Sequence, residues 1–375
     1  MLPPFSNWEK LKLALRLSYA DLFWKAPLTL TYILRSILIT KRRSLPSRLF
    51  IVCAVLKVAL GFSPRQIQYL SLPTRDAYKK WIQQQSKEAE KIGHQQHVTR
   101  LVYDREVLED GKSSLLWVGD RKQAKKVVLF FHGGGYAAPI TTGHLDWCWR
   151  AYILAGIEKG VEVAVAVLEY TLIPEARYPV QLRQAASGLA YLLHKGISPQ
   201  DIIIGGDSAG GQLTAQLICH LHQPQPTVPE ITLVKPLAGA FLVSPWVAQS
   251  TDDASYRENA WIDMLPTPGI VAFTKELLGP DAKPDLSAFP LDREESSLAG
   301  MTFVLSQIYI TAGAHEIFRD QVVSFKDRVK LLNPDLKLRF QYYENCAHDF
   351  IVIENEDGEC TRDMKQWMVD LLAVE

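Results

Sequence analysis

A serine in the middle of the chain lies in a turn that suits a covalent nucleophile. Ser208 is the centre of GDSAG, residues 206–210, between the apolar run DIII and the helical pattern QLTAQLICH. In a G-x-S-x-G pattern in this setting, the outer glycines allow a tight strand-to-helix turn that presents the hydroxyl above a sheet. The alternative is a glycine turn without chemistry, but the strand before it and the helix after it favour a nucleophile.

A serine hydroxyl becomes nucleophilic only when a neighbouring base takes its proton, and chain order selects one histidine for that role. Of the 9 histidines, only His315 and His348 follow the strand pattern SQIYITAG at 306–313. His348 lies in ENCAHDF, directly after the last strand pattern, LKLRFQYYE. Where a triad follows the chain order serine, acid, histidine, this is the place of the general base.

The base in turn needs a carboxylate that fixes its tautomer and stabilises the imidazolium. Two acids follow SQIYITAG closely, Glu316 and Asp320. They are one helical turn apart, so both can face the same side. Glu316 lies nearer the strand end and is the preferred candidate. The alternative for either acid is a solvated residue at a helix start, stabilised there by the helix dipole.

Three consecutive glycines follow the apolar run KVVLFF, in HGGG at 132–135. Backbone N–H groups aimed at a reacting carbonyl oxygen stabilise its developing charge, and glycine allows the backbone to approach closely. We expect Gly134 and Gly135 to be loop donors of such an oxyanion hole, with Gly133 a weaker candidate. The N–H of Ala209 is the expected second part of the hole. A phosphate-binding loop is disfavoured because the sequence lacks G-x-x-x-x-G-K-[ST].

The elements that would position these residues alternate between strand and helix patterns from about residue 99 onward. Such alternation predicts an α/β fold with a mostly parallel central sheet and helices on both faces. Residues 245–300 interrupt it and are expected to form part of a cap. The predicted strands are 99–106, 113–120, 126–131, 161–170, 201–207, 237–246, 306–313 and 336–344, and the predicted helices are 143–160, 178–196, 212–223, 320–332 and 361–373.

Residues 1–62 combine positive charge with two apolar runs. Ten Lys and Arg residues oppose two acids there, so ten minus two gives +8, and the rest of the chain carries −8. The runs at 26–40 and 48–62 are interrupted by Arg35 and Lys57 and fall short of the roughly 20 apolar residues that a spanning helix needs. Residues 7–25 have the pattern of an amphipathic helix with basic edges.

We therefore expect a helical cap within residues 1–90, followed by a catalytic domain of residues 91–375 with an insertion at 245–300. A membrane surface is a second expected partner of residues 1–62, and the two roles are compatible. A single membrane-spanning helix is less favoured.

Composition narrows the function further. The formal net charge is zero, which gives no indication of a nucleic-acid partner. The five cysteines are widely spaced without a CxxC pair, so neither a metal site nor a disulfide framework is expected. No cofactor is expected, and the oligomeric state stays open. The sequence holds no N-glycosylation sequon, and we expect an intracellular protein, cytoplasmic or associated with a membrane such as the endoplasmic reticulum.

Taken together, the motifs resemble the hormone-sensitive-lipase branch of the α/β-hydrolase fold. HGGG, GDSAGG, SPW at 244–246, the acid two residues after AGA and the histidine of CAHDF all match it. EYTLIPEARYP at 169–179 is similar to the YRLAPE element of that branch. The resemblance covers about residues 95–375 and is greatest to fungal steryl acetyl hydrolases and hydrolases of fungal natural-product pathways.

The resemblance implies a role for each matched residue. Glu316 stands where the branch usually has aspartate, and Thr171 and Ile173 replace its usual arginine and alanine. The site residues that the resemblance implies are the nucleophile Ser208, the general base His348 and the oxyanion donors Gly134, Gly135 and Ala209.

The expected function is that of a serine carboxylic-ester hydrolase that works through an acyl-enzyme. Trp246 and Trp261 and the apolar N-terminus favour a hydrophobic alcohol part such as a sterol, terpenoid or polyketide, and the resemblance implies a short acyl group such as acetyl. One alternative is acyl transfer or condensation in a biosynthetic pathway, with the same triad. Another is a non-catalytic ligand-binding receptor, which the complete set of serine, histidine and acid disfavours.

Overall fold

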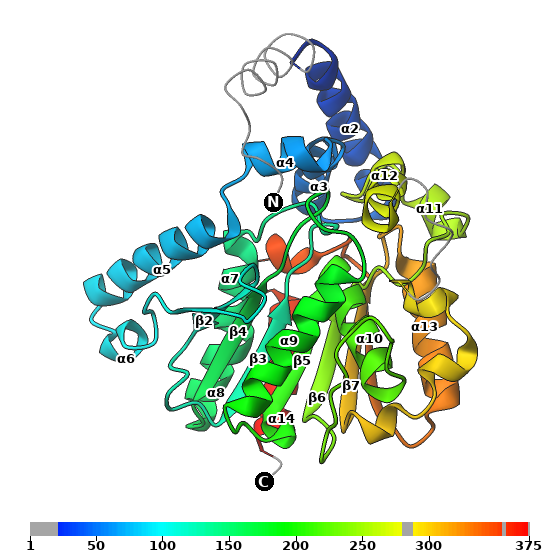
Figure 1. Cartoon of the computed structure of the whole chain (residues 1–375). Helices are drawn as coiled ribbons and strands as arrows, with labels where there is room; N and C mark the ends of the chain where they lie inside the picture. The colour runs from blue at the N-terminus through cyan, green and yellow to red at the C-terminus, as the bar shows by residue number, and fades with distance from the viewer. Residues whose placement is uncertain (1–21, 280–287, 355–357, 374–375) are drawn as a thin grey trace.

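A single eight-stranded sheet forms the centre of the molecule, with the strand order β1-β2-β4-β3-β5-β6-β7-β8 (Figure 1). The structure is a computed structural model that describes residues 22–279, 288–354 and 358–373. β2 pairs antiparallel with both of its neighbours, and all other pairs are parallel. The strands are β1 Arg105–Val107, β2 Ser114–Val118, β3 Lys126–Phe131, β4 Val163–Glu169, β5 Ile202–Asp207, β6 Gly239–Val243, β7 Gln307–Gly313 and β8 Lys337–Tyr343.

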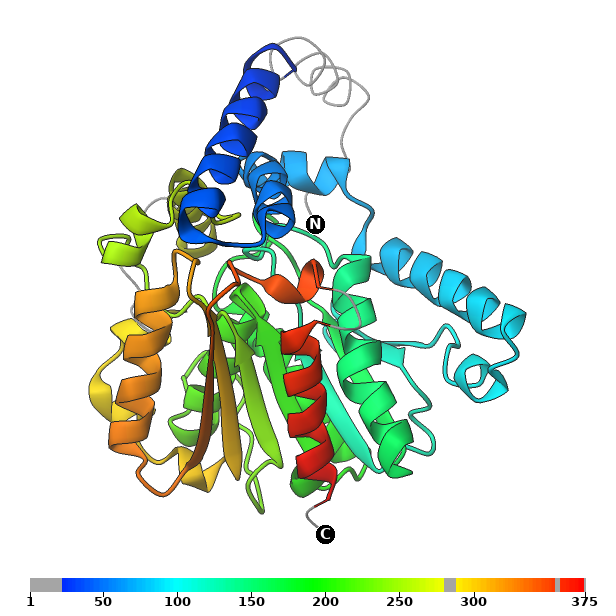
Figure 2. The same ribbon diagram turned by 180° about the vertical axis from the view of Figure 1, so that it is seen from behind.

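Helices cover both faces of this sheet (Figures 1 and 2). Because side chains alternate along a strand, β3 supplies Val127, Leu129 and Phe131 to one hydrophobic core and Val128 and Phe130 to the other. The first core lies under α9 Val180–His194, α10 Ala209–His222 and α13 Arg319–Leu332, and the second under α7 Thr142–Cys148, α8 Leu154–Lys159 and α14 Glu359–Leu372. The predicted α/β fold with a mostly parallel sheet is confirmed.

The helix predicted for residues 143–160 is interrupted. A π-helical turn, η2 Trp149–Ile153, separates α7 from α8. The element ends as predicted at Gly160, whose φ of 68° is the left-handed conformation that favours glycine. Regular periodicity did not reveal the π turn because the apolar residues on either side of it stay on the buried face.

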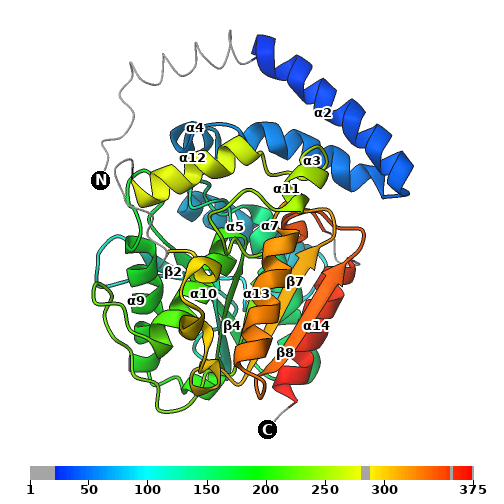
Figure 3. The same cartoon turned by 90° about the vertical axis from the view of Figure 1, so that its right-hand side faces the viewer.

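Helices from two distant parts of the chain lie across the carboxyl end of the sheet (Figure 3). The N-terminal part supplies α2 Leu22–Arg43, α3 Ser47–Leu60 and α4 Pro64–Leu70, and the segment after β6 supplies α11 Ala254–Glu258 and α12 Thr267–Leu278. We use "cap" for these five helices. The division into domains near residue 90 stays a prediction.

The remaining N-terminal helices belong beside the sheet rather than above it. α5 Thr74–Lys91 packs against α7, and Trp81 Nε1 donates to Asp146 Oδ1 at 2.8 Å. α6 Gln95–Val98 follows it and leads into β1. The amphipathic helix predicted for residues 7–25 lies mostly outside the described residues.

No single described helix is both long enough and apolar enough to cross a bilayer. One pair of helical segments, Ser47–Leu60 and Pro64–Lys91, together reaches the length and apolar composition of a membrane span. The two segments meet at a bend of 116°.

Candidate active site

The turn that carries Ser208 connects β5 to α10 and leaves room for no side chain beside it. A Cβ at Gly206 would lie 2.0 Å from the carbonyl oxygen of Phe131, and one at Gly210 would lie 1.9 Å from the same atom. Ser208 has φ 51° and ψ −115°, a strained backbone that this tight packing maintains. The two glycines are therefore a steric requirement of the turn, and the turn holds the serine at the start of α10.

Ser208, His348 and Glu316 form a continuous hydrogen-bonded relay. His348 Nε2 lies 2.9 Å from Ser208 Oγ, and His348 Nδ1 lies 3.2 Å from Glu316 Oε2. These contacts suit an imidazole that carries its proton on Nδ1, donates it to the glutamate and accepts the serine proton at Nε2. The residues follow β5, β7 and β8, whose carboxyl ends lie at one edge of the parallel sheet. The structure thus brings together three side chains that the sequence separates widely.

The acid in this relay is Glu316, and Asp320 lies elsewhere. Asp320 accepts the N–H of Ser255 at 2.8 Å and pairs with Arg319 at 2.8 Å. Glu316 is completely buried. Burial raises its pKa above the usual range, while the bond from His348 opposes that rise. Of the two acids that the sequence left open, only Glu316, the one nearer the strand end, contacts His348.

His315, the other histidine considered, points away from the relay. Its Nδ1 lies 3.2 Å from Arg43 Nη1 of α2. Burial, with the nearby charges of Arg43 and Arg319, lowers the pKa of His315 to about 4. The neutral ring therefore accepts a hydrogen bond from Arg43 and takes no part in the relay.

The glycine loop after β3 divides its N–H groups between two tasks. The N–H of Gly133 donates to Asp207 Oδ2 at 2.9 Å. Gly134 and Gly135 have φ values of 96° and 62°, and their N–H groups, like that of Ala209, donate to no other group among the described residues. Three unused donors beside the nucleophile have the character of an oxyanion hole, whereas Gly133 is engaged in holding the loop.

A buried acid cluster that sequence reasoning missed lies behind the nucleophile. His144 Nε2 lies 3.1 Å from Asp207 Oδ2, and His144, Asp207 and Asp349 place potential ligand atoms within 4.8 Å of one another. Burial and the adjacent Asp207 raise the pKa of Asp349 well above its usual range. Burial also opposes ionisation of Asp207, but His144 more than offsets this and lowers its pKa. The opposite directions of these two shifts favour a proton on Asp349 rather than on Asp207.

A cavity of about 380 Å³ opens above Ser208 and His348. The cap forms one side of its wall through α3, α4 and α12, and most of the lining side chains are apolar. They include Val52, Leu56, Leu60, Ile67, Trp246, Met264, Leu265, Ile270, Phe273 and Phe318. Ser208, His348, Gly134 and Gly135 therefore line the same cavity as the apolar side chains of the cap, which offer a surface to a ligand.

The two tryptophans expected to contact a ligand have different positions. Trp246 lines the cavity. The expectation was wrong for Trp261, which is 39% exposed, lies outside the cavity lining and has the Arg35 guanidinium 3.8 Å above its ring. Both residues lie in the segment 245–300 that the sequence assigns to a cap, but the sequence does not indicate whether each side chain faces the cavity or solvent.

Residues 128–352 match the family model described as alpha/beta hydrolase fold. An esterase of Acinetobacter venetianus is 28% identical over 229 residues, which cover 60% of this chain and 68% of the relative. An acetyl-hydrolase of Streptomyces hygroscopicus is 26% identical over 151 residues, which cover 40% of this chain and 46% of the relative.

Among solved structures, an esterase from the bacterial hormone-sensitive lipase family superimposes with a TM-score of 0.64 at 20% identity. The superposition covers 88% of this chain and 99% of that one. At this identity the structural likeness bears on the fold alone.

Proposed function

The chain belongs to the α/β-hydrolase family and is a carboxylic-ester hydrolase; we propose that it is of the hormone-sensitive-lipase branch and cleaves short-chain esters of hydrophobic alcohols. The proposal depends on one observation: the relay from Ser208 through His348 to Glu316 lies at the bottom of an apolar cavity. The resemblance that the motifs predicted is confirmed at the level of the family. The roles of the individual residues are proposals.

In the proposed reaction Ser208 Oγ attacks the ester carbonyl while His348 Nε2 takes its proton. The N–H groups of Gly134, Gly135 and Ala209 stabilise the oxyanion of the tetrahedral intermediate. That intermediate collapses to an acyl-enzyme as His348 returns the proton to the departing alcohol. Water, deprotonated by His348, then attacks the acyl-enzyme, and the acid and the free serine are released.

The cavity supports a hydrophobic alcohol part. Its lining residues from α3, α4 and α12 offer an apolar wall to the larger half of an ester, in the manner of sites that bury most of a small molecule. Sterols, terpenoids and polyketides are the alcohol classes that we propose. The similar acetyl-hydrolase supports a short acyl group.

A matched ester series tests this proposal. Purified protein would be offered acetyl, butyryl and decanoyl esters of one hydrophobic alcohol, and acetyl esters of a small alcohol, with alcohol release as the measurement. The highest kcat/KM is expected for the acetyl ester of the hydrophobic alcohol, and Ser208→Ala should abolish the release. Preference for the small alcohol, or for the long acyl chain, would contradict the assignment of the cavity.

We also propose that the outer face of the cap rests on a membrane surface. Leu30, Leu34 and Leu38 recur every four residues on one face of α2 and are 57%, 53% and 58% exposed. The exposed basic residues Lys41, Arg42 and Arg43 form the last turn of the helix. Val52 of α3 is exposed as well and lines the cavity, so the apolar face continues to the entrance of the cavity. This combination of apolar face and basic residues suits anionic lipid.

Sedimentation with vesicles tests the membrane proposal. We expect binding to vesicles that contain phosphatidylserine, weaker binding to phosphatidylcholine alone, and loss of binding when all three leucines become glutamine. The triple variant should hydrolyse p-nitrophenyl acetate at the normal rate, because none of the three lines the cavity. Equal sedimentation of wild type and variant would overturn the proposal.

A further inference from the structure

A buried carboxylate outside the relay joins the two loops that carry its base and its acid. Asp263 lies between α11 and α12 and is completely buried. Its Oδ1 accepts the N–H of His348 at 3.2 Å, and its Oδ2 accepts the N–H of Ile317, the residue after Glu316, at 2.7 Å. One side chain is thus bonded to the backbone of the proposed base and to the backbone beside the proposed acid.

Asp263 is itself fixed by its surroundings. Oδ1 also accepts the N–H of Met264 at 2.6 Å, and the N–H of Asp263 donates to the carbonyl oxygen of Asn259 at 3.0 Å. The Asn259 side chain then donates to the carbonyl oxygen of Glu316 at 3.0 Å. We call residues 259–264 the bracket, since they hold the acid loop at Glu316 and Ile317 and the base loop at His348.

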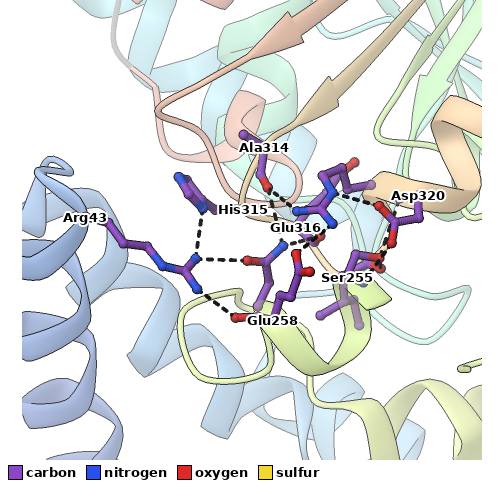
Figure 4. A network of polar contacts seen from close by, with 10 residues as sticks. Arg43, Ser255, Glu258, Ala314, His315, Glu316 and Asp320 are labelled. Atoms are coloured by element: carbon purple, nitrogen blue, oxygen red, sulfur yellow. Dashed lines mark hydrogen bonds and ion pairs between the residues drawn. The ribbon is translucent and has the colours of Figure 1, made fainter. Parts of the chain in front are cut away.

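The cap contacts both ends of this bracket. At the outer end, Arg43 of α2 donates to Asn259 Oδ1 at 3.2 Å. Figure 4 shows the contact of Arg43 to His315 beside it. Directly after the inner end, Lys57 Nζ of α3 donates to the carbonyl oxygen of Leu265, the residue that follows the bracket, at 2.5 Å. Burial lowers the pKa of Lys57 to about 8, although the negative charge of Asp263 opposes that shift. Two cap helices thus meet the segment that holds the relay.

A carboxylate with no contact to a reacting atom can still govern the rate through geometry. The base has to stay within about 2.6–3.2 Å of the hydroxyl whose proton it takes. A displacement of about 1 Å in such a site can cost about 10²-fold in rate. The three N–H bonds to Asp263 offset the cost of burying its charge, so its removal would free two loops at once.

We propose that Asp263 is a positioning residue that holds the His348 loop and the Glu316 loop in the relative placement the relay requires. The proposal rests on the proposed function of Ser208, His348 and Glu316. It assigns Asp263 no proton transfer and no contact with the substrate. Its main effect belongs to kcat, because two of the three N–H groups it binds belong to the loops that carry the catalytic side chains.

The test compares Asp263→Asn with Asp263→Glu and with Asp252→Asn. Asp252 is exposed, contacts neither loop and gives the same chemical change in the same segment. For Asp263→Asn we expect kcat per folded molecule to fall about 10²-fold, with KM within about threefold of wild type. The far-downfield proton resonance of the His348–Glu316 bond should shift or disappear. Asp263→Glu should recover about tenfold of the loss, and Asp252→Asn should match wild type.

A purely structural role would give a different result: a lower melting temperature, with unchanged kcat and resonance in the folded fraction. That result would overturn the proposal. If Asp263→Asn does not fold, Asp263→Glu becomes decisive, and wild-type kcat in that variant would equally count against the proposal. Ser208→Ala separates this failure from a failure of the proposed function, since activity that survives Ser208→Ala would disprove the relay itself.

Discussion

The loops at the carboxyl edge of the sheet and the cap above them are held by different means. The relay residues are buried, bonded to one another and supported by glycines that no other residue can replace without moving the backbone. The cap meets them through a few polar contacts, such as those of Arg43 and Lys57, and exposes leucines on α2. We therefore expect substitutions in the loops at the sheet edge to change turnover, and substitutions in the cap to change which ester binds.

The largest effect is expected from Ser208→Ala, which removes the proposed nucleophile. kcat for p-nitrophenyl acetate should fall by at least about 10⁴-fold, while binding of a hydrophobic ester in the cavity persists. A stopped-flow assay measures kcat, equilibrium dialysis measures ester binding, and a fluorophosphonate should no longer label the variant. Near-normal turnover by the variant would contradict the view that the loops at the sheet edge, rather than the cap, control turnover.

Glu316→Gln should follow, because a neutral amide does not fix the imidazole tautomer or stabilise the imidazolium. A loss of about 10³-fold in kcat is expected with little change in KM. Asp320→Asn is the matched control and should stay within about threefold of wild type, since its partners are Ser255 and Arg319. The opposite order of effects would make Asp320 the acid.

Gly135→Ala tests the place where the two regions touch. The added Cβ would lie 2.6 Å from Phe273 Cδ2 of α12, at a backbone φ of 62° that disfavours alanine. Displacement of a proposed oxyanion donor should lower kcat about 10²-fold. Adding Phe273→Ala to this variant should relieve the clash and restore part of the rate. If the double variant is no faster, the loss comes from the strained backbone at position 135 alone.

Leu56→Ala alters the cavity wall without touching the relay. We expect KM for an acetyl ester of a hydrophobic alcohol to rise about fivefold, which corresponds to the loss of ligand contact equal to about one buried methylene, at about 0.8 kcal/mol. kcat for p-nitrophenyl acetate should remain unchanged. A similar loss with both substrates would indicate that the cap also controls turnover directly.

Arg43→Ala should have the smallest effect. It removes the outer contact between α2 and the bracket, which is partly exposed and therefore weak. A decrease of about twofold in kcat is expected, measured with the same acetyl ester. A much larger decrease would mean that the cap holds the relay more tightly than its few contacts suggest.

How much could be predicted from the sequence also differs between the two regions. The turn at Ser208 and the loop of His348 have local signals, namely glycines at fixed spacing and a position after a strand. Asp263 has no such signal: one aspartate in a Pro- and Asp-rich segment looks like any loop acid until folding brings it to His348 and Ile317. The same holds for Trp246, which is buried beside the cavity, and Trp261, which is partly exposed outside it, because spacing does not encode their packing.

The clash that forbids a side chain at positions 206 and 210 has a consequence for laboratory evolution. In a saturation library these two codons should return glycine alone, whatever ester is used for selection. Adaptation to a new ester would therefore accumulate in α3, α4 and α12, where a changed side chain meets the ligand and not a carbonyl oxygen of the sheet.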